Sequence, residues 1–431
     1  MATANLIANI VVRPLFKPTS IYPKTEEDSS RVLNLITILL FISGVCFLTL
    51  CLNRPIFAFD GAISENIVQD KVDTYIKSAE VSLWEESILR KYEGKKVYFK
   101  ADGVAHIRTT KYLNGYPTNI NIVEINPNIN KNLIIKPEIA GEKLNSKTQI
   151  KNIAKKNDAL VAINGGYFKP QTGVPLGSLV IDGQTLTGPI YNRVGIGIEQ
   201  NENGTKFSMA RVSPKIKIKN SLKEIEIDNI NQPRMLSTYS IAYNSLWGEY
   251  SPHAPKYGVN ALIQDGKIVT MSENPIKIPK DGYVLSAPYE KVNAIFGLKN
   301  LEFEILYPEE FKNANHILGA GPYLVKDGKI FVDAKDEKLT AIAGKNPRSA
   351  IGYTKDNNLI IITADGREQT SVGLTLTQLA SFMKSLDCYN AMNFDGGSST
   401  VMYIGGRVAN SPHAGSNGIR ISNALIIKEA N

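Results

Sequence analysis

Cysteine is scarce in this sequence, with three residues among 431. Two of them, Cys46 and Cys51, lie in one apolar segment, so Cys388 is the only cysteine in the rest of the chain. A disulfide framework is therefore excluded for the main part of the protein. Cys388 follows a segment with helical periodicity, and we expect it to be a buried, unreactive thiol rather than a nucleophile.

Histidine is also rare, and concentrated basic runs are absent. The four histidines form no cluster with acidic residues at a spacing typical of metal ligands, so we expect neither a metal nor another cofactor. The lysines are scattered, and no zinc-finger, basic-helix or aromatic-basic RNA-binding pattern occurs, which argues against a nucleic-acid partner. The formal net charge is nevertheless +8. It suits a polyanion, an acidic membrane surface or a phosphorylated glycan.

The first 53 residues predict a membrane anchor. Residues 1–32 are polar and contain three prolines, so we interpret them as a disordered cytoplasmic tail. Residues 33–53 are predicted to form a transmembrane helix, because the run Leu33–Leu52 is uncharged and long enough to cross a hydrocarbon core of about 30 Å. Four basic residues precede this run and only Arg54 follows closely, which predicts a single-pass protein with a cytoplasmic N-terminus and an extracytoplasmic catalytic domain. A cleaved signal peptide is the alternative.

The remaining residues predict a helical linker followed by one large domain. Apolar residues recur at helical spacing from Ile67 to Leu89, so we interpret residues 54–95 as a linker helix that lies on the domain or acts as a spacer. From Lys96 the pattern changes to short strands separated by Asp-Gly pairs, which are typical of hairpin turns. Because few helices are indicated, we predict an α+β domain over residues 96–428, with a twisted mixed β-sheet and flanking helices.

The stretch Asn393–Thr400 combines polar side chains with two adjacent glycines. It follows a predicted amphipathic helix over residues 374–386, in which Thr375 and Gln378 have the spacing of a capping box. Adjacent glycines permit a tight turn and leave backbone N–H groups able to bind an anion. Asp395 and the hydroxyls beside it would then face a ligand, although an ordinary hydrophilic turn is the alternative.

Other candidate binding residues lie in polar or glycine-containing turns and loops. These are Asn164, Gly165 and Gly166 after residues 159–163, Gly177 in the glycine-rich loop beyond them, Asp365 after residues 359–363, and His413 in a loop close to the Gly-Gly turn. A polar turn at the end of a buried strand is a common position for a binding site, because the strand fixes the turn in place.

In this order the motifs resemble those of the phosphodiester glycosidase family. The matching segments are Ala162–Phe168, residues 347–352, Asp365–Arg367, residues 373–376, Asn393–Thr400 and residues 422–425. Several ordered motifs spread over this distance make the resemblance specific. Two residues depart from the family's pattern: Ser398 stands where many members have a third glycine, and Phe394 stands where many have leucine.

The resemblance implies hydrolysis of a sugar-1-phosphodiester at the anomeric carbon, with release of a phosphomonoester. The implied substrates are phosphorylated glycans, such as N-acetylglucosamine-1-phosphodiesters in envelope material or exopolysaccharide. Asp395 and Asp365 would form the catalytic carboxylate pair, with their roles unassigned. Arg348 would clamp the phosphate, with a salt bridge as the structural alternative. The residues expected to bind substrate are Asn164, Gly165, Gly166, Gly177, Asn393, Gly396, Gly397, Ser398, Ser399 and His413.

Two other functions remain open at this point. A glycan-binding or envelope-assembly protein would keep the fold without turnover, and the convergence of Asp395, Asp365 and Arg348 in one pocket would distinguish the enzyme from it. A serine hydrolase using Ser398 or Ser399 ranks last, because the sequence has no nucleophile-elbow pattern and no placed histidine.

Overall fold

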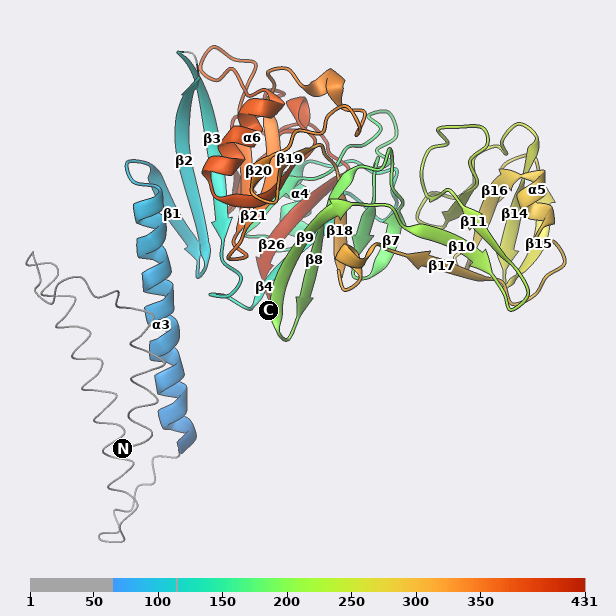
Figure 1. Ribbon diagram of the computed structural model, residues 1–431, viewed down its shortest axis with the longest axis horizontal. Coiled ribbons are helices and arrows are strands. Elements are labelled where there is room, and N and C mark those ends of the chain that lie inside the picture. Colours follow the sequence, from blue (N-terminus) through green and yellow to red (C-terminus); the bar gives the residue numbers. More distant parts are fainter. Residues whose placement is uncertain (1–64, 114, 431) are drawn as a thin grey trace, which may run out of the picture. The chain divides into compact units, whose positions relative to one another are not determined.

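The computed structural model describes residues 65–113 and 115–430 (Figure 1). The chain divides into two units, residues 1–72 and 73–431, and the second unit contains every feature discussed below except the start of helix α3 (Glu65–Lys91). The predicted tail over residues 1–32 and the predicted membrane helix over residues 33–53 lie outside the described residues.

No helix in the described part of the chain is both long and apolar enough to cross a membrane. Helix α3 has 27 residues, but charged side chains occur along its whole length. On this finding, the predicted membrane location, with an extracytoplasmic domain held by an N-terminal helix, is corrected.

The predicted α+β fold class is wrong, because the domain is built mainly from β-strands. The described residues form 26 strands and four α-helices, which are α3, α4 (Ile150–Lys156), α5 (Tyr289–Asn293) and α6 (Leu376–Ser385). The strands make five sheets. Among the paired strands described, β12 (Asn229–Ile230) and β13 (Ile241–Asn244) run parallel, and the other pairs are antiparallel. Of the five described sheets, the one that contains this pair is mixed and the other four are antiparallel, so the mixed sheet that we predicted does not dominate the domain.

Three sheets surround the main core. Sheet 1 has the order β1 (Lys96–Ala101), β2 (Val104–Leu113), β3 (Tyr116–Ile125), β22 (Leu359–Ala364), β21 (Arg348–Thr354), β23 (Cys388–Asn393), β19 (Tyr323–Lys326), β20 (Lys329–Ile330). Sheet 2 has the order β25 (Arg407–Val408), β24 (Met402–Ile404), β5 (Val161–Asn164), β26 (Asn423–Glu429), β4 (Leu133–Ile139). Sheet 3 has the order β7 (Gln184–Thr187), β6 (Leu179–Ile181), β18 (His316–Gly319), β8 (Val194–Asn201), β9 (Gly204–Arg211).

Two further sheets enclose a separate apolar cluster. Sheet 4 has the order β11 (Glu224–Ile227), β10 (Lys215–Lys219), β17 (Glu302–Leu306), and sheet 5 has the order β12, β13, β16 (Gly282–Pro288), β14 (Gly258–Gln264), β15 (Lys267–Ser272). Their cluster includes Ile218, Ala261, Leu285 and Val292. Three short 3-10 turns in the rest of the domain are Glu309–Phe311, Thr340–Ile342 and Gly397–Ser399.

Strand β22 explains why the sequence suggested flanking helices on the sheet. Its apolar run is buried on both faces: Leu359 and Ile361 join the main core, whereas Ile360 and Ile362 join a second cluster under helices. An uninterrupted apolar strand is typical of a sheet covered by helices on both sides. Here the side facing the main core is covered by other sheets, a case that apolar runs alone do not distinguish.

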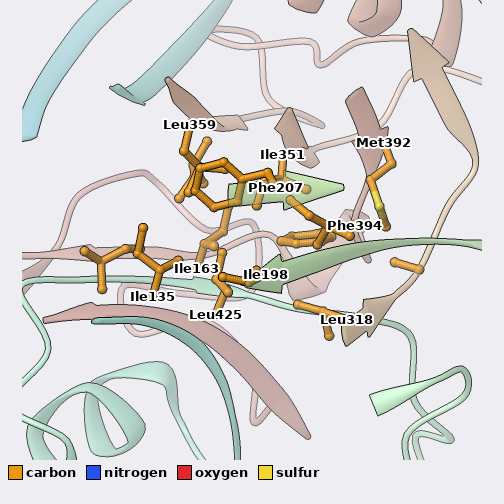
Figure 2. Close-up of a cluster of buried hydrophobic side chains, with 14 of the residues drawn as sticks. Ile135, Ile163, Ile198, Phe207, Leu318, Ile351, Leu359, Met392, Phe394 and Leu425 are labelled. Atoms are coloured by element: carbon orange, nitrogen blue, oxygen red, sulfur yellow. The ribbon is translucent and has the colours of Figure 1, made fainter. Parts of the chain in front are cut away.

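Figure 2 shows this main core. Leu359, Ile351 and Met392 of sheet 1 pack with Ile163 and Leu425 of sheet 2, and residues of sheet 3 complete the cluster. The core therefore joins the strands that carry the predicted motifs, because β21, β22 and β23 lie on one side of it and β5 and β26 on the other.

The local predictions hold better than the fold class. Thr375 caps α6 with the predicted capping box: its hydroxyl accepts the Gln378 N–H (3.1 Å), and the Gln378 side chain accepts the Thr375 N–H (2.9 Å). The hairpin turns at Asp182, Asp265 and Asp327 are also confirmed, each with positive φ at the aspartate and the following glycine. Both residues in that conformation define the turn that matches the twist of a tight hairpin.

The opposite face of sheet 1 is covered by helices. Helix α6 lies against β19 and β20 (Figure 1) and buries one apolar face that includes Leu379 and Met383. Trp84, Ile88 and Tyr92, at the C-terminal end of α3 and just beyond it, join the same cluster. Cys388 is buried there too, as predicted.

Candidate active site

The two glycine turns singled out in the sequence lie against each other in the structure. The Asp395 N–H donates to the Gly165 carbonyl oxygen (3.0 Å), and Asn164 Nδ2 donates to the Asp395 carbonyl oxygen (2.7 Å). Asn164 Oδ1 accepts bonds from Ser349 Oγ (2.6 Å) and from the Val401 N–H (3.1 Å). Asn164 is 1% exposed, so it is the buried link that holds the Asp395 turn to β5.

A cavity of about 500 Å³ opens beside this junction. It is lined by Asp395, Ser398, Ser399, Tyr167, Phe168, Lys147, Pro170, Ile419 and Arg420. The lining combines a carboxylate, hydroxyls, aromatic rings and cationic side chains. This combination suits a ligand that has both apolar and polar faces and carries negative charge.

Asp395 is the carboxylate of this cavity, and its charge is energetically costly there. Burial raises its pKa from 3.8 to about 6, although hydrogen bonds from the Ser399 side chain and the Gly396 N–H and the charge of Arg193 act in the opposite direction. The bond from the Gly396 N–H to Asp395 Oδ1 is 2.9 Å long. The group is therefore poised to exchange a proton near neutral pH, which general acid–base catalysis requires.

Tyr167 forms the wall beside Asp395. Its hydroxyl donates to the Gly321 carbonyl oxygen (2.8 Å) and accepts from Asn393 Nδ2 (3.0 Å), and burial raises its pKa further above 10. The guanidinium of Arg193 lies 5.0 Å from the centre of the Tyr167 ring, and its Nε donates to the Glu337 carbonyl oxygen (3.1 Å). Asn393, predicted to bind substrate, is fully buried and positions Tyr167 instead.

Three cations near the cavity were not among the predicted site residues. Arg367 Nη1 donates to Ser398 Oγ (3.3 Å), and Arg367 Nη2 donates to Asn346 Oδ1 (2.8 Å). Arg367 is exposed, as is Arg420, and Lys147 is half-buried. The motif Asp365–Arg367 contained the signal for Arg367, whereas Arg420 and Lys147 have no sequence pattern that could have identified them.

The amides of the glycine turns are already hydrogen-bonded within the protein. The Gly397 N–H donates to the Pro347 carbonyl oxygen (2.8 Å) and the Gly396 N–H to Asp395 Oδ1. In the second turn, the N–H groups of Gly165 and Gly166 donate to the carbonyl oxygen (3.0 Å) and to Oδ1 (2.8 Å) of Asn423. These four donors are therefore not an anion cradle of the kind that we predicted.

Close packing accounts for glycine in the second turn. A Cβ on Gly165 would lie 2.2 Å from Asn423 Oδ1, and one on Gly166 would lie 2.5 Å from the Gly319 carbonyl oxygen. Gly177 also packs on Gly319, with a φ of +139°, and its carbonyl oxygen accepts a bond from Thr187 Oγ1 (2.6 Å). It is not among the residues that line the Asp395 cavity.

Arg348 contacts backbone rather than the cavity lining. It is 1% exposed, and its guanidinium donates to the carbonyl oxygens of Leu374 (2.9 Å), Ile342 (2.6 Å) and Gly344. Burial lowers its pKa to about 10. These partners are carbonyl oxygens rather than a carboxylate, and they make Arg348 an anchor for the loop before β21.

Asp365 lines a different cavity from Asp395. Its Oδ1 accepts a bond from Asn410 Nδ2 (2.9 Å), and both of its oxygens accept from the Ser411 N–H (3.2 and 3.1 Å). Burial raises its pKa. His413 is exposed and is not among the described residues that line either cavity. The structure therefore assembles Asp395, Ser398 and Ser399 of the predicted set in one cavity, without Asp365, Arg348 or His413.

Known proteins resemble this chain in sequence and fold. The mouse N-acetylglucosamine-1-phosphodiester alpha-N-acetylglucosaminidase is 26% identical over 173 residues, which cover 35% of this chain and 33% of that protein. An uncharacterized protein of Bacillus subtilis, the SPbeta prophage-derived YomE, is 34% identical over 120 residues, which cover 27% of this chain and 18% of that protein. The chain thus spans a third or less of the length of these relatives.

A solved structure shows the same fold over most of the chain. A hypothetical protein from Synechocystis superposes with a TM-score of 0.68 at 23% identity, covering 77% of this chain and 63% of that chain. The family model for phosphodiester glycosidases matches residues 256–428, which include Asp395 and the turn around it. The resemblance predicted from the motifs is therefore confirmed over residues 256–428, the part of the chain that the phosphodiester glycosidase model matches.

Proposed function

We propose that this protein hydrolyses the glycosidic bond of sugar-1-phosphodiesters, with Asp395 as the central catalytic residue. The observation that carries the proposal is the position of Asp395: a carboxylate with a pKa of about 6 lines a cavity that also contains hydroxyls, aromatic rings and cations. Titratable groups whose pKa is shifted by burial within a cavity are typical of catalytic sites. The family match supports the same reaction class.

The chemistry requires little assistance at the leaving group. When the bond between the anomeric carbon and the phosphate oxygen breaks, the electron pair stays on that oxygen, and a phosphomonoester is released. Such a leaving group is acidic and needs no proton from the enzyme. Asp395 accepts a proton from the attacking water, or it attacks the anomeric carbon itself before water hydrolyses the resulting ester. A single carboxylate in the cavity is compatible with both routes.

The cationic side chains are the proposed phosphate-binding groups. Arg367 presents a planar guanidinium next to Ser398, and Arg420 and Lys147 line the cavity. Guanidinium groups bind phosphate oxygens through paired N–H donors. Tyr167 and Phe168 would pack against the sugar ring, as aromatic rings do with the apolar face of a saccharide. In this arrangement Arg367 replaces Arg348 as the proposed phosphate ligand.

A glycan-binding protein without turnover is the second candidate, and one observation favours it. Asp365 is bonded to Asn410 and Ser411 and lines another cavity, so the pair of carboxylates usual for glycoside cleavage is not assembled around one cavity. The acidity of the leaving group reduces the need for a second carboxylate, and we therefore place the enzyme first.

The test is an assay of the full chain against a panel of sugar-1-phosphodiesters, including phosphodiester-linked glycans, with detection of free reducing sugar. We expect release of sugar by the wild type and by Asp356→Asn, a control that removes an exposed carboxylate outside the cavity. Asp395→Asn is expected to abolish release while retaining binding. Binding of a glycan by the wild type without cleavage of any member of the panel would establish the second candidate instead.

A further inference from the structure

A cationic groove, lined by residues of sheet 1 and of the β24–β25 hairpin of sheet 2, is separate from the Asp395 cavity. It consists of two adjoining cavities of about 460 and 200 Å³, which share Arg108 and Ala409 in their linings. The basic residues that line this cationic groove are Lys95, Lys96, Lys100, Arg108 and Arg407. The polar residues Thr109, Thr110, Asn119 and Asn121 line the larger cavity with them.

Strand register places the centre of the groove on one face of sheet 1. Lys96 of β1 pairs with Arg108 of β2, which pairs with Asn121 of β3, so the three side chains form a row across the strands. Val104 points to the same face of β2 as Arg108, and Val123 to the same face of β3 as Asn121, because each pair is separated by an even number of residues. Both valines belong to the main core. The groove thus continues the core-facing side of the sheet beyond the end of the apolar core.

The cations of the groove form no ion pair within the described part of the chain, although the charge of Arg108 opposes the raised pKa of Asp365. None of the five basic residues has a carboxylate within ion-pair distance there. Asp365 is the one carboxylate in the lining, and Asn410 and Ser411 donate to its oxygens. Lys100, Arg108 and Arg407 line the smaller cavity together with His106. In addition to burial, their charges lower the pKa of His106.

The loop after β22 connects the groove to the Asp395 cavity. Asp365 lines the groove, and Arg367, two residues later, contacts Ser398, which lines the Asp395 cavity. Two residues span at most about 7 Å from Cα to Cα, so the two sites lie within the length of a few sugar units. A chain that is bound at Asp395 can therefore extend over this loop into the groove.

We propose that the cationic groove binds a phosphate-bearing segment of a glycan chain whose reacting phosphodiester occupies the Asp395 cavity. This inference rests on the proposed function, because it assigns the polymeric form of the same substrate class. The unpaired cations match phosphate groups spaced along a chain, and the hydroxyls and amides between them match sugar hydroxyls. Tyr98, the aromatic ring of the groove, is already engaged by His106 and Lys100, whereas single-stranded nucleic acid is bound by open aromatic faces.

The experiment measures binding of a phosphodiester-linked hexamer of N-acetylglucosamine-1-phosphate to the full chain. Every variant carries Asp395→Asn, so that turnover cannot consume the probe. The groove variant combines Lys96→Glu, Arg108→Glu and Arg407→Glu, and the matched control combines Lys267→Glu, Lys280→Glu and Lys299→Glu. The control residues are exposed, lie outside the Asp395 cavity and the groove, and have no described ion pair. Each variant replaces three cations by three carboxylates, so the net charge changes equally in both.

We expect the groove variant to bind the hexamer roughly tenfold or more weakly, and the control to bind it normally. Binding by the Asp395→Asn chain with an unchanged groove should weaken with salt and should be absent for the uncharged N-acetylglucosamine hexamer. Circular dichroism establishes that each variant is folded, and Arg407→Gln alone, on an exposed turn strand, should give a smaller loss in the same direction.

Three results would overturn the inference: unchanged affinity of the groove variant, an equal loss in the control, or tighter binding of an oligothymidylate of matched charge. Failure of the proposed function is recognised separately. Hydrolysis of a monomeric sugar-1-phosphodiester by the wild-type chain tests the Asp395 site. Selective loss of hexamer binding in the groove variant supports the groove whether or not that hydrolysis occurs.

Discussion

At the scale of single residues, the buried carboxylate of Asp395 has opposite effects on the stability of the fold and on the proposed activity. Its pKa of about 6 lies above 3.8, so the folded protein binds its proton more tightly than the unfolded chain does. At neutral pH the ionised group therefore destabilises the fold. The same ionised group is what the proposed reaction needs. Residues that weaken the fold in this manner are typical of functional sites.

Asp395→Asn should consequently stabilise the protein and inactivate it. The amide keeps an oxygen to accept the Gly396 N–H but carries no charge. We expect turnover of a sugar-1-phosphodiester to fall roughly 10²- to 10⁴-fold, and the melting temperature at neutral pH to rise by about 2 °C or more. Calorimetry and steady-state kinetics measure the two effects. A lower melting temperature would show that the carboxylate contributes net stability, contrary to this assignment.

The pH dependence of these effects has a definite sign. Below 3.8 Asp395 is protonated in both the folded and the unfolded state, and above about 6 it is ionised in both. Its unfavourable contribution therefore develops as pH rises between these values. The difference in melting temperature between Asp395→Asn and wild type should be small at about pH 4 and larger at about pH 7. A difference that does not change with pH would contradict the raised pKa.

Activity should fall on the acid side for the same reason. If Asp395 acts as base or nucleophile, kcat/KM of the wild type decreases as pH falls through about 6, because the protonated carboxyl cannot accept a proton or attack carbon. The pH profile with a monomeric sugar-1-phosphodiester measures this. A rate that rises toward acid would instead indicate that the protonated form of Asp395 acts as a general acid.

The predicted residues divide according to whether groups of the protein already satisfy their charges. Asp395 lies beside the second glycine turn because both follow strands that border one core, and the motifs indicated this arrangement. Arg348 donates to carbonyl oxygens of the loop just before it and to that of Leu374, and Asp365 accepts a bond from Asn410. A local pattern does not reveal whether a buried charge is already satisfied by distant groups, so these two residues were predicted to meet substrate.

Arg348 and Arg367 allow a paired test of structural and binding roles. Arg348→Ala removes a buried guanidinium together with its bonds to three carbonyl oxygens, and we expect a loss of unfolding free energy of about 3 kcal/mol. Arg367→Ala removes an exposed side chain and should leave stability nearly unchanged while it raises KM. Denaturant unfolding and steady-state kinetics of both variants distinguish the structural role from the binding role. The reverse pattern would restore Arg348 as the phosphate ligand.

At the scale of elements, the glycine turns serve to join sheets. The Gly165–Gly166 turn at the end of β5 packs on Asn423 at the start of β26 and on Gly319 at the end of β18. The local elements, such as the capped helix α6 and the Asp-Gly hairpins, were predictable because each depends on neighbouring residues. The packing of sheet on sheet depends on contacts between distant residues, and the apolar runs were compatible with helices as well.

Gly166→Ala tests this packing role. A Cβ there would lie 2.5 Å from a backbone carbonyl oxygen, which cannot rotate away as a side chain can. We expect a destabilisation of about 1–3 kcal/mol, typical of overpacking. Gly248→Ala is the control, because no atom lies within 4 Å of its Cβ position and its φ is not in the left-handed region. Equal stability of the two variants in urea would remove the packing explanation.

At the scale of the whole molecule, residues far apart in the sequence build one site. Tyr167 and Phe168 follow β5, whereas Asp395 follows β23 and Arg420 precedes β26, and all four line one cavity. The family match begins at residue 256, so it does not include the first of these segments. The domain boundary predicted at residue 96 remains a prediction. Because Trp84, Ile88 and Tyr92 are buried in the second core cluster, we propose that the folded domain begins before it.

Truncation measures where the folded domain begins. Glu124 on β3 is 2% exposed and is bonded to two residues near the end of α3: Tyr92 donates its hydroxyl (2.6 Å) and Lys91 forms an ion pair (3.1 Å). Removal of residues 1–72 leaves these contacts in place. Removal of residues 1–95 exposes apolar surface and leaves a buried carboxylate without partners, a defect that typically costs about 3–5 kcal/mol by itself.

We therefore expect the chain that begins at residue 73 to unfold at a clearly higher urea concentration than the chain that begins at residue 96. Part of this difference is electrostatic and part comes from packing, and Glu124→Gln separates them. In the shorter chain this substitution removes the unpaired charge and should restore some stability, whereas in the longer chain it breaks a satisfied pair and should destabilise. Equal midpoints for the two chains would place the boundary at residue 96, because the contacts of α3 with sheet 1 would then contribute nothing to the stability of the domain.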